Sequence, residues 1–154
     1  MHRMSSSKYL ETDFILRDKF AGGYYLPDGT VDYELKKKVR TEYANNILDN
    51  DYTLCVSGSG NFSYRLYETL SCGRIPLFVD TDSPLPYDFI IDWKKYCVWI
   101  DQTEVNRIDE IVRKFHEQIS PDAFIEMQRA CRRLWLDYLS PEGFYANFYR
   151  HFQI

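Results

Sequence analysis

The stretch CVSGSGNFSYRLYETLSCGRIPLFVD, residues 55–80, contains the features that decide the fold. An apolar run over 52–56 ends in a glycine loop, and a second apolar run over 75–79 follows. Between them, Ser63 is a favourable N-cap for a helix over 64–71, and a glycine soon after favours the end of that helix. Two strands joined by one short helix form a βαβ unit, so the two strands are predicted to be parallel.

The rest of the chain continues this alternation of strands and helices. Apolar periodicity, turn residues and caps predict further strands at 12–17 and 96–100, and helices over 32–50, 104–118, 120–138 and from near Pro141. We therefore predict an α/β fold, a Rossmann-like parallel sheet flanked by helices. Residues 12–154 are expected to form this domain, and residues 1–11 an N-terminal connector.

The amino-acid composition and net charge of the chain favour some classes of protein over others. A chain of 154 residues with 45% apolar and 27% charged residues is typical of one soluble globular domain. Its net charge of −4 and pI near 5.4 argue against a nucleic-acid partner. No apolar run approaches the ~18 residues of a membrane span, and no signal sequence is visible. We expect a cytoplasmic location, either free or at the periphery of a membrane. The four separated cysteines are expected to be reduced core residues.

The glycine loop, GSGN at 58–61, is the candidate binding site. Parallel sheets bind ligands at the carboxyl ends of their strands, where glycines let backbone N–H groups approach closely. The following helix N-terminus favours an anion by about 0.3–1 kcal/mol and disfavours a cation such as Arg65 unless an anion lies in front of it. Glu68, three residues on, can accept hydrogen bonds from the vicinal hydroxyls of a ribose. The order of phosphate and then ribose suggests a nucleoside diphosphate.

A blander interpretation explains the same residues as a glycine turn beside a surface ion pair. An Arg–Glu pair at this spacing on a helix contributes only a few tenths of a kcal/mol, about 0.2–0.5. The sequence also lacks both the GxGxxG and the P-loop patterns. On the pattern alone, the two interpretations stay open.

A longer run from Gly60 to Ile100 resembles the carboxyl-terminal half of exostosin-type glycosyltransferases, glycosyltransferase family 47, and is most similar to bacterial-type members. The shared features are Ser63, Arg65, Glu68, GRIP at 73–76, Leu85-Pro86 and Ile91-Asp92-Trp93, with FILRDKFAGG upstream. The resemblance covers about residues 12–152. It is the combination of these motifs, more than any one of them, that is specific.

The resemblance implies the carboxyl-terminal domain of a GT-B architecture, which holds a nucleotide-sugar donor of the UDP or GDP type. It implies a glycosyltransferase that moves the sugar to a glycan or glycoconjugate acceptor. Glu68 would bind the ribose, Arg65 the diphosphate, and Arg17 and Lys19 the phosphates. The predicted donor-binding residues are therefore Arg17, Lys19, Gly58, Gly60, Asn61, Ser63, Arg65 and Glu68. Many relatives carry a basic residue where this chain has Ser57, so the resemblance implies a weaker affinity through the absence of a phosphate or orientation contact.

The amino-terminal acceptor half of that architecture is not recognisable in the sequence, so no catalytic residue is assigned. We expect a separate acceptor domain or a homo-oligomer as partner. The aromatic end FYANFYRHF, 144–152, either packs on its own domain or docks against such a partner or a membrane surface. The alternative function is a non-catalytic interaction module that retains half of the fold. A Rossmann methyltransferase is disfavoured because the predicted strand 12–17 precedes the glycine loop.

Metal chemistry is a further alternative, because Asp80-Thr81-Asp82 resembles a DxD motif that could hold Mg²⁺ or Mn²⁺ against a diphosphate. GT-B enzymes generally use protein cations and a helix N-terminus instead, and Asp is common in turns after strands. The three histidines are scattered without ligand spacing. We therefore expect donor binding without a metal cofactor.

Overall fold

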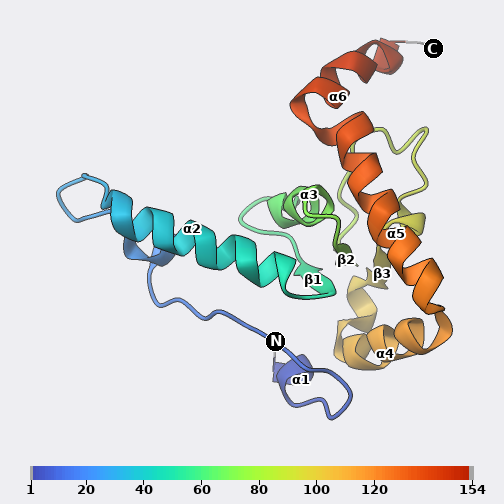
Figure 1. Ribbon diagram of the computed structural model, residues 1–154, viewed down its shortest axis with the longest axis horizontal. Coiled ribbons are helices and arrows are strands. Elements are labelled where there is room, and N and C mark those ends of the chain that lie inside the picture. The colour runs from blue at the N-terminus through green and yellow to red at the C-terminus, as the bar shows by residue number, and fades with distance from the viewer. Residues whose placement is uncertain (1, 153–154) are drawn as a thin grey trace.

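The computed structural model describes residues 2–152 and contains one parallel sheet (Figure 1). Its strands are β1 (Tyr52–Cys55), β2 (Ile75–Asp80) and β3 (Val98–Asp101), in the order β1-β2-β3. Both pairings are parallel, with Cys55 opposite Phe78 and Asp80 opposite Asp101. The predicted α/β fold with a Rossmann-like parallel sheet is confirmed. All strands end at the same edge, which is where the glycine loop begins.

The predicted helices are present in the predicted order, together with a short helix that lies in the predicted connector. They are α1 (His2–Ser5), α2 (Tyr33–Leu48), α3 (Tyr64–Ser71), α4 (Ile108–Gln118), α5 (Pro121–Leu134) and α6 (Pro141–Asn147). Short 3₁₀ segments span Phe20–Gly23, Trp93–Lys95, Gln102–Arg107 and Phe148–Phe152, and one π turn spans Trp135–Leu139. The side chains of Asp32, Ser120 and Ser140 cap α2, α5 and α6, which is why these helices start where the sequence predicts.

The core lies on both faces of the sheet. The central strand β2 is buried from Ile75 to Val79, as its continuous apolar run predicts. On one face Cys55 meets Thr69 of α3, and on the other Tyr52 packs edge-on against Phe115 of α4. Burying each large apolar side chain contributes about 1.5–3 kcal/mol, so the α3 and α4 contacts fix the sheet and thereby the loop that joins β1 to α3.

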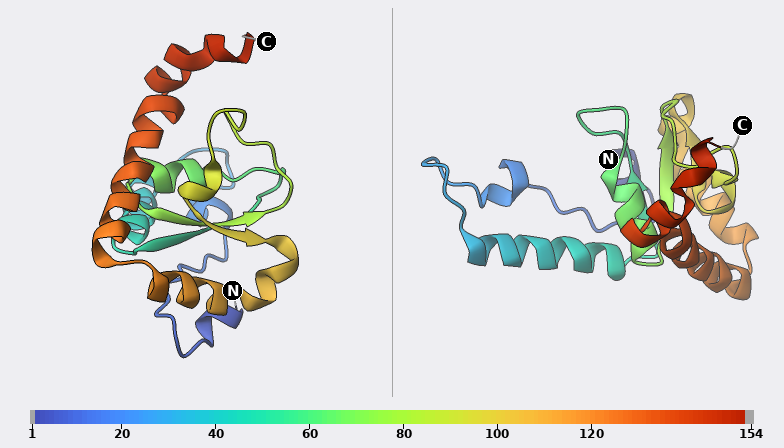
Figure 2. Two further views of the ribbon diagram at one scale, coloured as in Figure 1. Left: turned by 90° about the vertical axis from the view of Figure 1, so that its right-hand side faces the viewer. Right: turned by 90° about the horizontal axis from the view of Figure 1, so that it is seen from above.

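Helix α2 reaches away from the sheet, as Figure 1 and the view from above in Figure 2 show. The sequence predicts an apolar face with Leu35, Val39, Tyr43 and Ile47, but only Ile47 is buried and the others are half-buried. The helix is held to the body near its carboxyl end. There Arg74 donates two hydrogen bonds to the carbonyl of Leu48.

The predicted strand at 12–17 is wrong. The segment has no strand partner and runs beside α2, where side-chain contacts compete with sheet pairing. Asn46 donates to the backbone carbonyl of Asp13 at 2.9 Å and to its carboxylate at 2.8 Å, and Arg17 pairs with Glu42. β1 is therefore an edge strand of the described sheet. Because residues 12–17 do not form a strand before the glycine loop, they no longer count against a Rossmann methyltransferase.

Other differences are confined to the ends of elements. The strand predicted from residue 96 begins at Val98. The helix predicted from residue 104 is preceded by a 3₁₀ segment, whose first turn is capped by the side chain of Asp101, which accepts the N–H of Thr103. In the predicted connector, Met4 is buried in the core and α1 contacts α4. The boundary at residue 11 itself stays a prediction.

The four cysteines are free, as predicted, and all but Cys72 are buried. Burial raises the pKa of the Cys55 and Cys131 thiols to about 12, so they are protonated core residues. Among the described residues, no helix is both long enough and apolar enough to cross a bilayer.

Candidate functional site

The glycine loop between β1 and α3 is folded onto itself. The N–H of Gly58 donates to the carbonyl of Phe62 at 3.1 Å, and the N–H of Phe62 donates to the carbonyl of Gly60 at 2.9 Å. Among the described residues, the N–H groups of Ser59, Gly60 and Asn61 find no protein acceptor. These donors stand at the carboxyl edge of a parallel sheet, where they can bind a ligand's acceptor oxygens.

Asn61 fixes this loop to the turn that follows β2. Its side-chain amide donates to the carbonyl of Thr81 at 3.1 Å, and the Thr81 hydroxyl donates back to its Oδ1 at 2.6 Å. The amide is thus engaged inside the protein. The structure gives Asn61 a role in holding the loop, and the direct ligand contact expected of it stays a prediction.

The two loop glycines have different surroundings. A Cβ built on Gly58 meets nothing within 4 Å, and its φ is not positive, so the fold itself does not require glycine there. A Cβ on Gly60 falls 2.6 Å from the ring of Phe62, which would have to move. The space beside the Gly58 backbone is open, and the ligand contacts expected of Gly58 and Gly60 stay predictions.

Ser63 occupies the N-cap position of α3, as the sequence predicts. It is 9% exposed and has extended backbone angles, yet its side chain makes no capping hydrogen bond. The Leu66 N–H returns to the Ser63 carbonyl at 3.3 Å, and within the described chain the N–H groups of Tyr64 and Arg65 have no protein acceptor. The first turn of α3 therefore keeps donors available for an anion.

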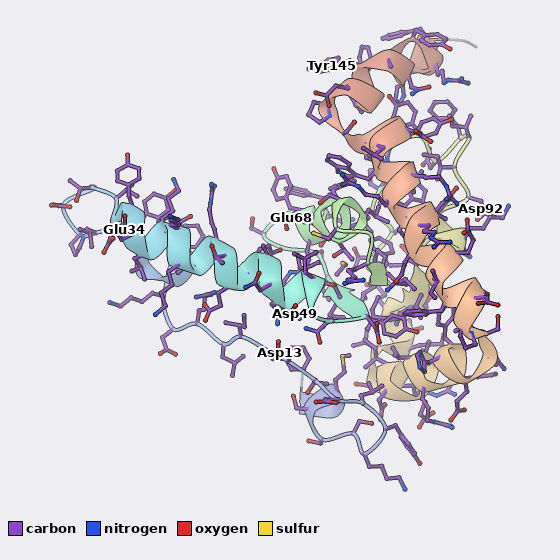
Figure 3. The ribbon with its side chains drawn as sticks, in the orientation of Figure 1. Asp13, Glu34, Asp49, Glu68, Asp92 and Tyr145 are labelled. Carbon is purple, nitrogen blue, oxygen red and sulfur yellow. The ribbon has the colours of Figure 1, made fainter. Side chains whose placement is uncertain are left out.

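Arg65 and Glu68 are brought together through a third residue, Tyr43 of α2. The Tyr43 hydroxyl donates to Oε2 of Glu68 at 2.5 Å and accepts from Nε of Arg65 at 3.2 Å. The Arg65 guanidinium also lies over the Tyr43 ring, 5.0 Å from its centroid. Figure 3 shows Glu68 on α3 beside α2. The surface ion pair of the blander interpretation is replaced by this three-residue network.

Tyr43 is the site residue that sequence reasoning missed. The sequence predicts it on the apolar face of its helix with Val39 and Ile47, since a tyrosine fits an apolar stripe. Burial, followed by the hydrogen bond to Glu68, raises the pKa of Tyr43 to about 12, while Arg65 partly opposes the shift. The phenol is therefore a neutral donor under physiological conditions.

Arg17 and Lys19 lie outside this network. Arg17 pairs with Glu42 at 2.7 Å and lies beside α2, and Lys19 is the residue before the 3₁₀ turn at 20–23. Among the described residues, no hydrogen bond or ion pair joins either of them to the glycine loop or to Arg65. Their predicted phosphate contacts stay predictions.

The Asp80-Thr81-Asp82 turn is shaped by its own hydrogen bonds. Asp80 Oδ1 accepts the N–H of Asp82 at 2.9 Å, and Asp82 has a left-handed φ of 58°. Asp and Asn tolerate that conformation and form such turns routinely. The described residues contain no group of three or more His, Cys, Asp or Glu side chains that could hold a metal ion.

The glycine loop and the open N-terminus of α3 lie at the carboxyl ends of the parallel strands, where α/β folds of this class bind ligands. The family model for the exostosin GT47 domain matches residues 21–115, more than half of the chain. The chain therefore belongs to the exostosin GT47 family. The matched residues include the whole network of Tyr43, Arg65 and Glu68, and leave out Arg17 and Lys19.

Curated relatives agree with this assignment. The chain is similar to exostosin-1 of Drosophila melanogaster, 26% identical over 113 residues, which cover 73% of this chain and 14% of that protein. It is also similar to a probable beta-1,4-xylosyltransferase of Arabidopsis thaliana, 27% identical over 97 residues, 63% of this chain and 22% of that protein. A probable glucuronosyltransferase of Oryza sativa subsp. japonica is 28% identical over 80 residues, 52% of this chain and 18% of that protein. The chain thus spans a small part of each relative.

Proposed function

We propose that residues 12–154 form the donor-binding domain of a glycosyltransferase, corresponding to the carboxyl-terminal half of a GT-B architecture. The domain would bind a nucleoside diphosphate sugar and present it for transfer to a glycan or glycoconjugate hydroxyl. The observation that carries the proposal is the pair Arg65 and Glu68 in the first two turns of α3, directly after a loop with open N–H groups. This pair lies within the matched family domain.

Arg65 is suited to the diphosphate. Its Nε is engaged by Tyr43, while among the described residues neither terminal guanidinium nitrogen has a hydrogen-bonding partner. Two such nitrogens match two phosphate oxygens in a bidentate, charge-assisted arrangement. The open N–H groups of the first turn of α3 add neutral donors to the same anion. Together these groups would stabilise the diphosphate as it leaves the sugar.

Glu68 is suited to the ribose. Its Oε2 accepts from Tyr43, and Oε1 has no hydrogen-bonding partner within the described residues. An ionised carboxylate only accepts hydrogen bonds, so it recognises hydroxyl donors and repels phosphate. Glu68 lies one helical turn after the open N–H groups, which supports a ribose contact next to the diphosphate contact.

The acceptor and the residues that act on it would come from a separate domain or a second copy. The curated relatives whose printed names are xylosyltransferase and glucuronosyltransferase support sugar transfer as the class of reaction.

Calorimetric titration with UDP, GDP, dTDP and CMP, each with Mg²⁺ and with EDTA, tests the proposal. We expect saturable binding of UDP or GDP that does not depend on the metal. The Arg65→Ala variant should bind the diphosphate about tenfold or more weakly. The Arg133→Ala variant, which loses the same charge on the exposed surface of α5, should bind as wild type does. Failure of a folded wild-type chain to bind any of these nucleotides would contradict the proposal.

The second candidate is a non-catalytic interaction module, and the carboxyl-terminal aromatics favour it. Tyr87 donates to the carbonyl of Phe144 at 2.7 Å, so one side of this segment packs on the domain. Tyr145 is 75% exposed and Phe152 71% exposed, so the other side is open (Figure 3). Self-association in light scattering, without nucleotide binding, would favour this function over the first.

A further inference from the structure

Tyr43 connects helix α2 to helix α3. It stands on α2, the helix that reaches away from the sheet, and its hydroxyl contacts both predicted ligand-binding side chains of α3. Among the described residues of α2 only Ile47 is fully buried, and Tyr43 is half-buried at the surface between α2 and α3. The contacts of this hydroxyl with Arg65 and Glu68 therefore suggest a role in the candidate binding site.

The direction of each hydrogen bond is fixed by chemistry. Arg65 can only donate, an ionised Glu68 can only accept, and a phenol has one proton and two lone pairs. The Tyr43 hydroxyl must therefore accept a hydrogen bond from Arg65 and donate one to Glu68. The distances of 3.2 Å and 2.5 Å agree with a directed chain from Arg65 through Tyr43 to Glu68.

The network orients both binding groups and leaves their ligand-facing atoms open. Exposed arginine and glutamate side chains each sample many rotamers, and ordering them on binding lowers affinity. Tyr43 holds Arg65 by Nε and by its ring, and holds Glu68 by Oε2. The terminal guanidinium nitrogens and Oε1 remain for the diphosphate and the ribose.

We propose that Tyr43 is a positioning residue of the donor site, which orients Arg65 toward the diphosphate and Glu68 toward the ribose of the same nucleotide. This inference rests on the proposed function. It differs from a role in holding α2 to the body, because a structural role would not couple one hydroxyl to two separate parts of one ligand.

The test is NMR-detected titration of the Tyr43→Phe chain with UDP and uridine, and with GDP and guanosine. Tyr33→Phe is the matched control, since Tyr33 begins the same helix and is 74% exposed. We expect Tyr43→Phe to raise the Kd of the bound diphosphate by about tenfold and that of its nucleoside by a smaller factor. Tyr33→Phe should leave both unchanged. In the Arg65→Ala background, the extra loss for the diphosphate over the nucleoside should disappear.

Wild-type affinity in the Tyr43→Phe chain, or the same extra loss in the Arg65→Ala background, would overturn the inference. A second signature does not depend on any ligand. The Nε–H of Arg65 should give a protected NMR signal in wild type and in Tyr33→Phe, and a rapidly exchanging one in Tyr43→Phe. If the wild-type chain binds no nucleotide, the proposed function fails, and an Nε–H signal unaffected by Tyr43→Phe would separately refute the positioning network.

Discussion

Gly58→Ala should stabilise the free protein and weaken nucleotide binding. A Cβ at position 58 meets nothing within 4 Å and the φ there is not positive, so the native loop accommodates alanine. Removing the conformational freedom of glycine from the unfolded chain then stabilises the fold by about 0.4–1 kcal/mol. In a domain of this size, that gain corresponds to a rise in Tm of about 1–4 °C.

The same methyl group occupies the space that a nucleotide bound to the loop would fill. Overpacking at a well-fitted contact costs about 1–3 kcal/mol, which corresponds to a Kd about five- to 150-fold higher. Differential scanning calorimetry and nucleotide titration measure the two effects separately. A higher Tm together with a weaker nucleotide affinity would show that the glycine at position 58 serves ligand binding and is not required by the fold.

Gly29→Ala is the matched control. Gly29 also has nothing within 4 Å of a built Cβ, but its φ is +84°, a left-handed conformation that costs other residues about 1–2 kcal/mol. This variant should lower Tm and leave nucleotide affinity unchanged. The reasoning is refuted if Gly58→Ala binds nucleotide as wild type does, or if it lowers Tm as Gly29→Ala does.

Four further predictions address the site, the reactivity of the thiols, the pH dependence of stability and the packing of the carboxyl-terminal helices. Arg65→Ala should raise the Kd for the bound diphosphate by about tenfold or more and that for its nucleoside much less, and equal losses would contradict a phosphate role. Cys72, the one cysteine that is not buried, should react with a thiol reagent at pH 8 while the other three react only on unfolding; equal rates for all four would count against the described core. Because burial raises the pKa of the Cys55 thiol from 9.0 to about 12 in the folded state, its contribution to stability is complete below pH 9 and is lost as the pH rises from 9 to 12. Urea unfolding at pH 8 and pH 11 should show this decrease, and an unchanged free energy of unfolding would contradict it. Gly143→Ala places a Cβ 2.4 Å from the carbonyl of Leu136 and should destabilise the fold by about 1–3 kcal/mol or more, measurable by urea unfolding; wild-type stability would show that α6 can shift.

The parts of the fold with local signals were predictable from the sequence. The helix over 64–71 has a favourable N-cap residue and a terminating glycine, and it begins and ends where those residues predict. The buried run at 75–79 is apolar on both faces, so its place in the middle of a parallel sheet follows from composition. Such elements are determined by residues that lie next to one another in the chain.

The predictions that failed depend on distant partners. The apolar pattern of 12–17 fits a strand, yet its polar groups pair with α2, more than twenty residues further along the chain. Tyr43 reads as a core residue of an amphipathic helix, and only the placement of α2 against α3 shows its contacts with Arg65 and Glu68. The sequence could name the binding residues by resemblance, but it could not show what orients them.

The central claim is that a nucleoside diphosphate binds at the loop between β1 and α3. The most direct test is a backbone amide NMR titration of the 18.4 kDa chain with the diphosphate that binds in calorimetry, in the presence of EDTA. We predict that the largest shifts fall on residues 58–68 and on Tyr43, with small changes in α5 and α6. Saturable shifts centred elsewhere on the sheet, or no shifts from a folded chain, would contradict the claim.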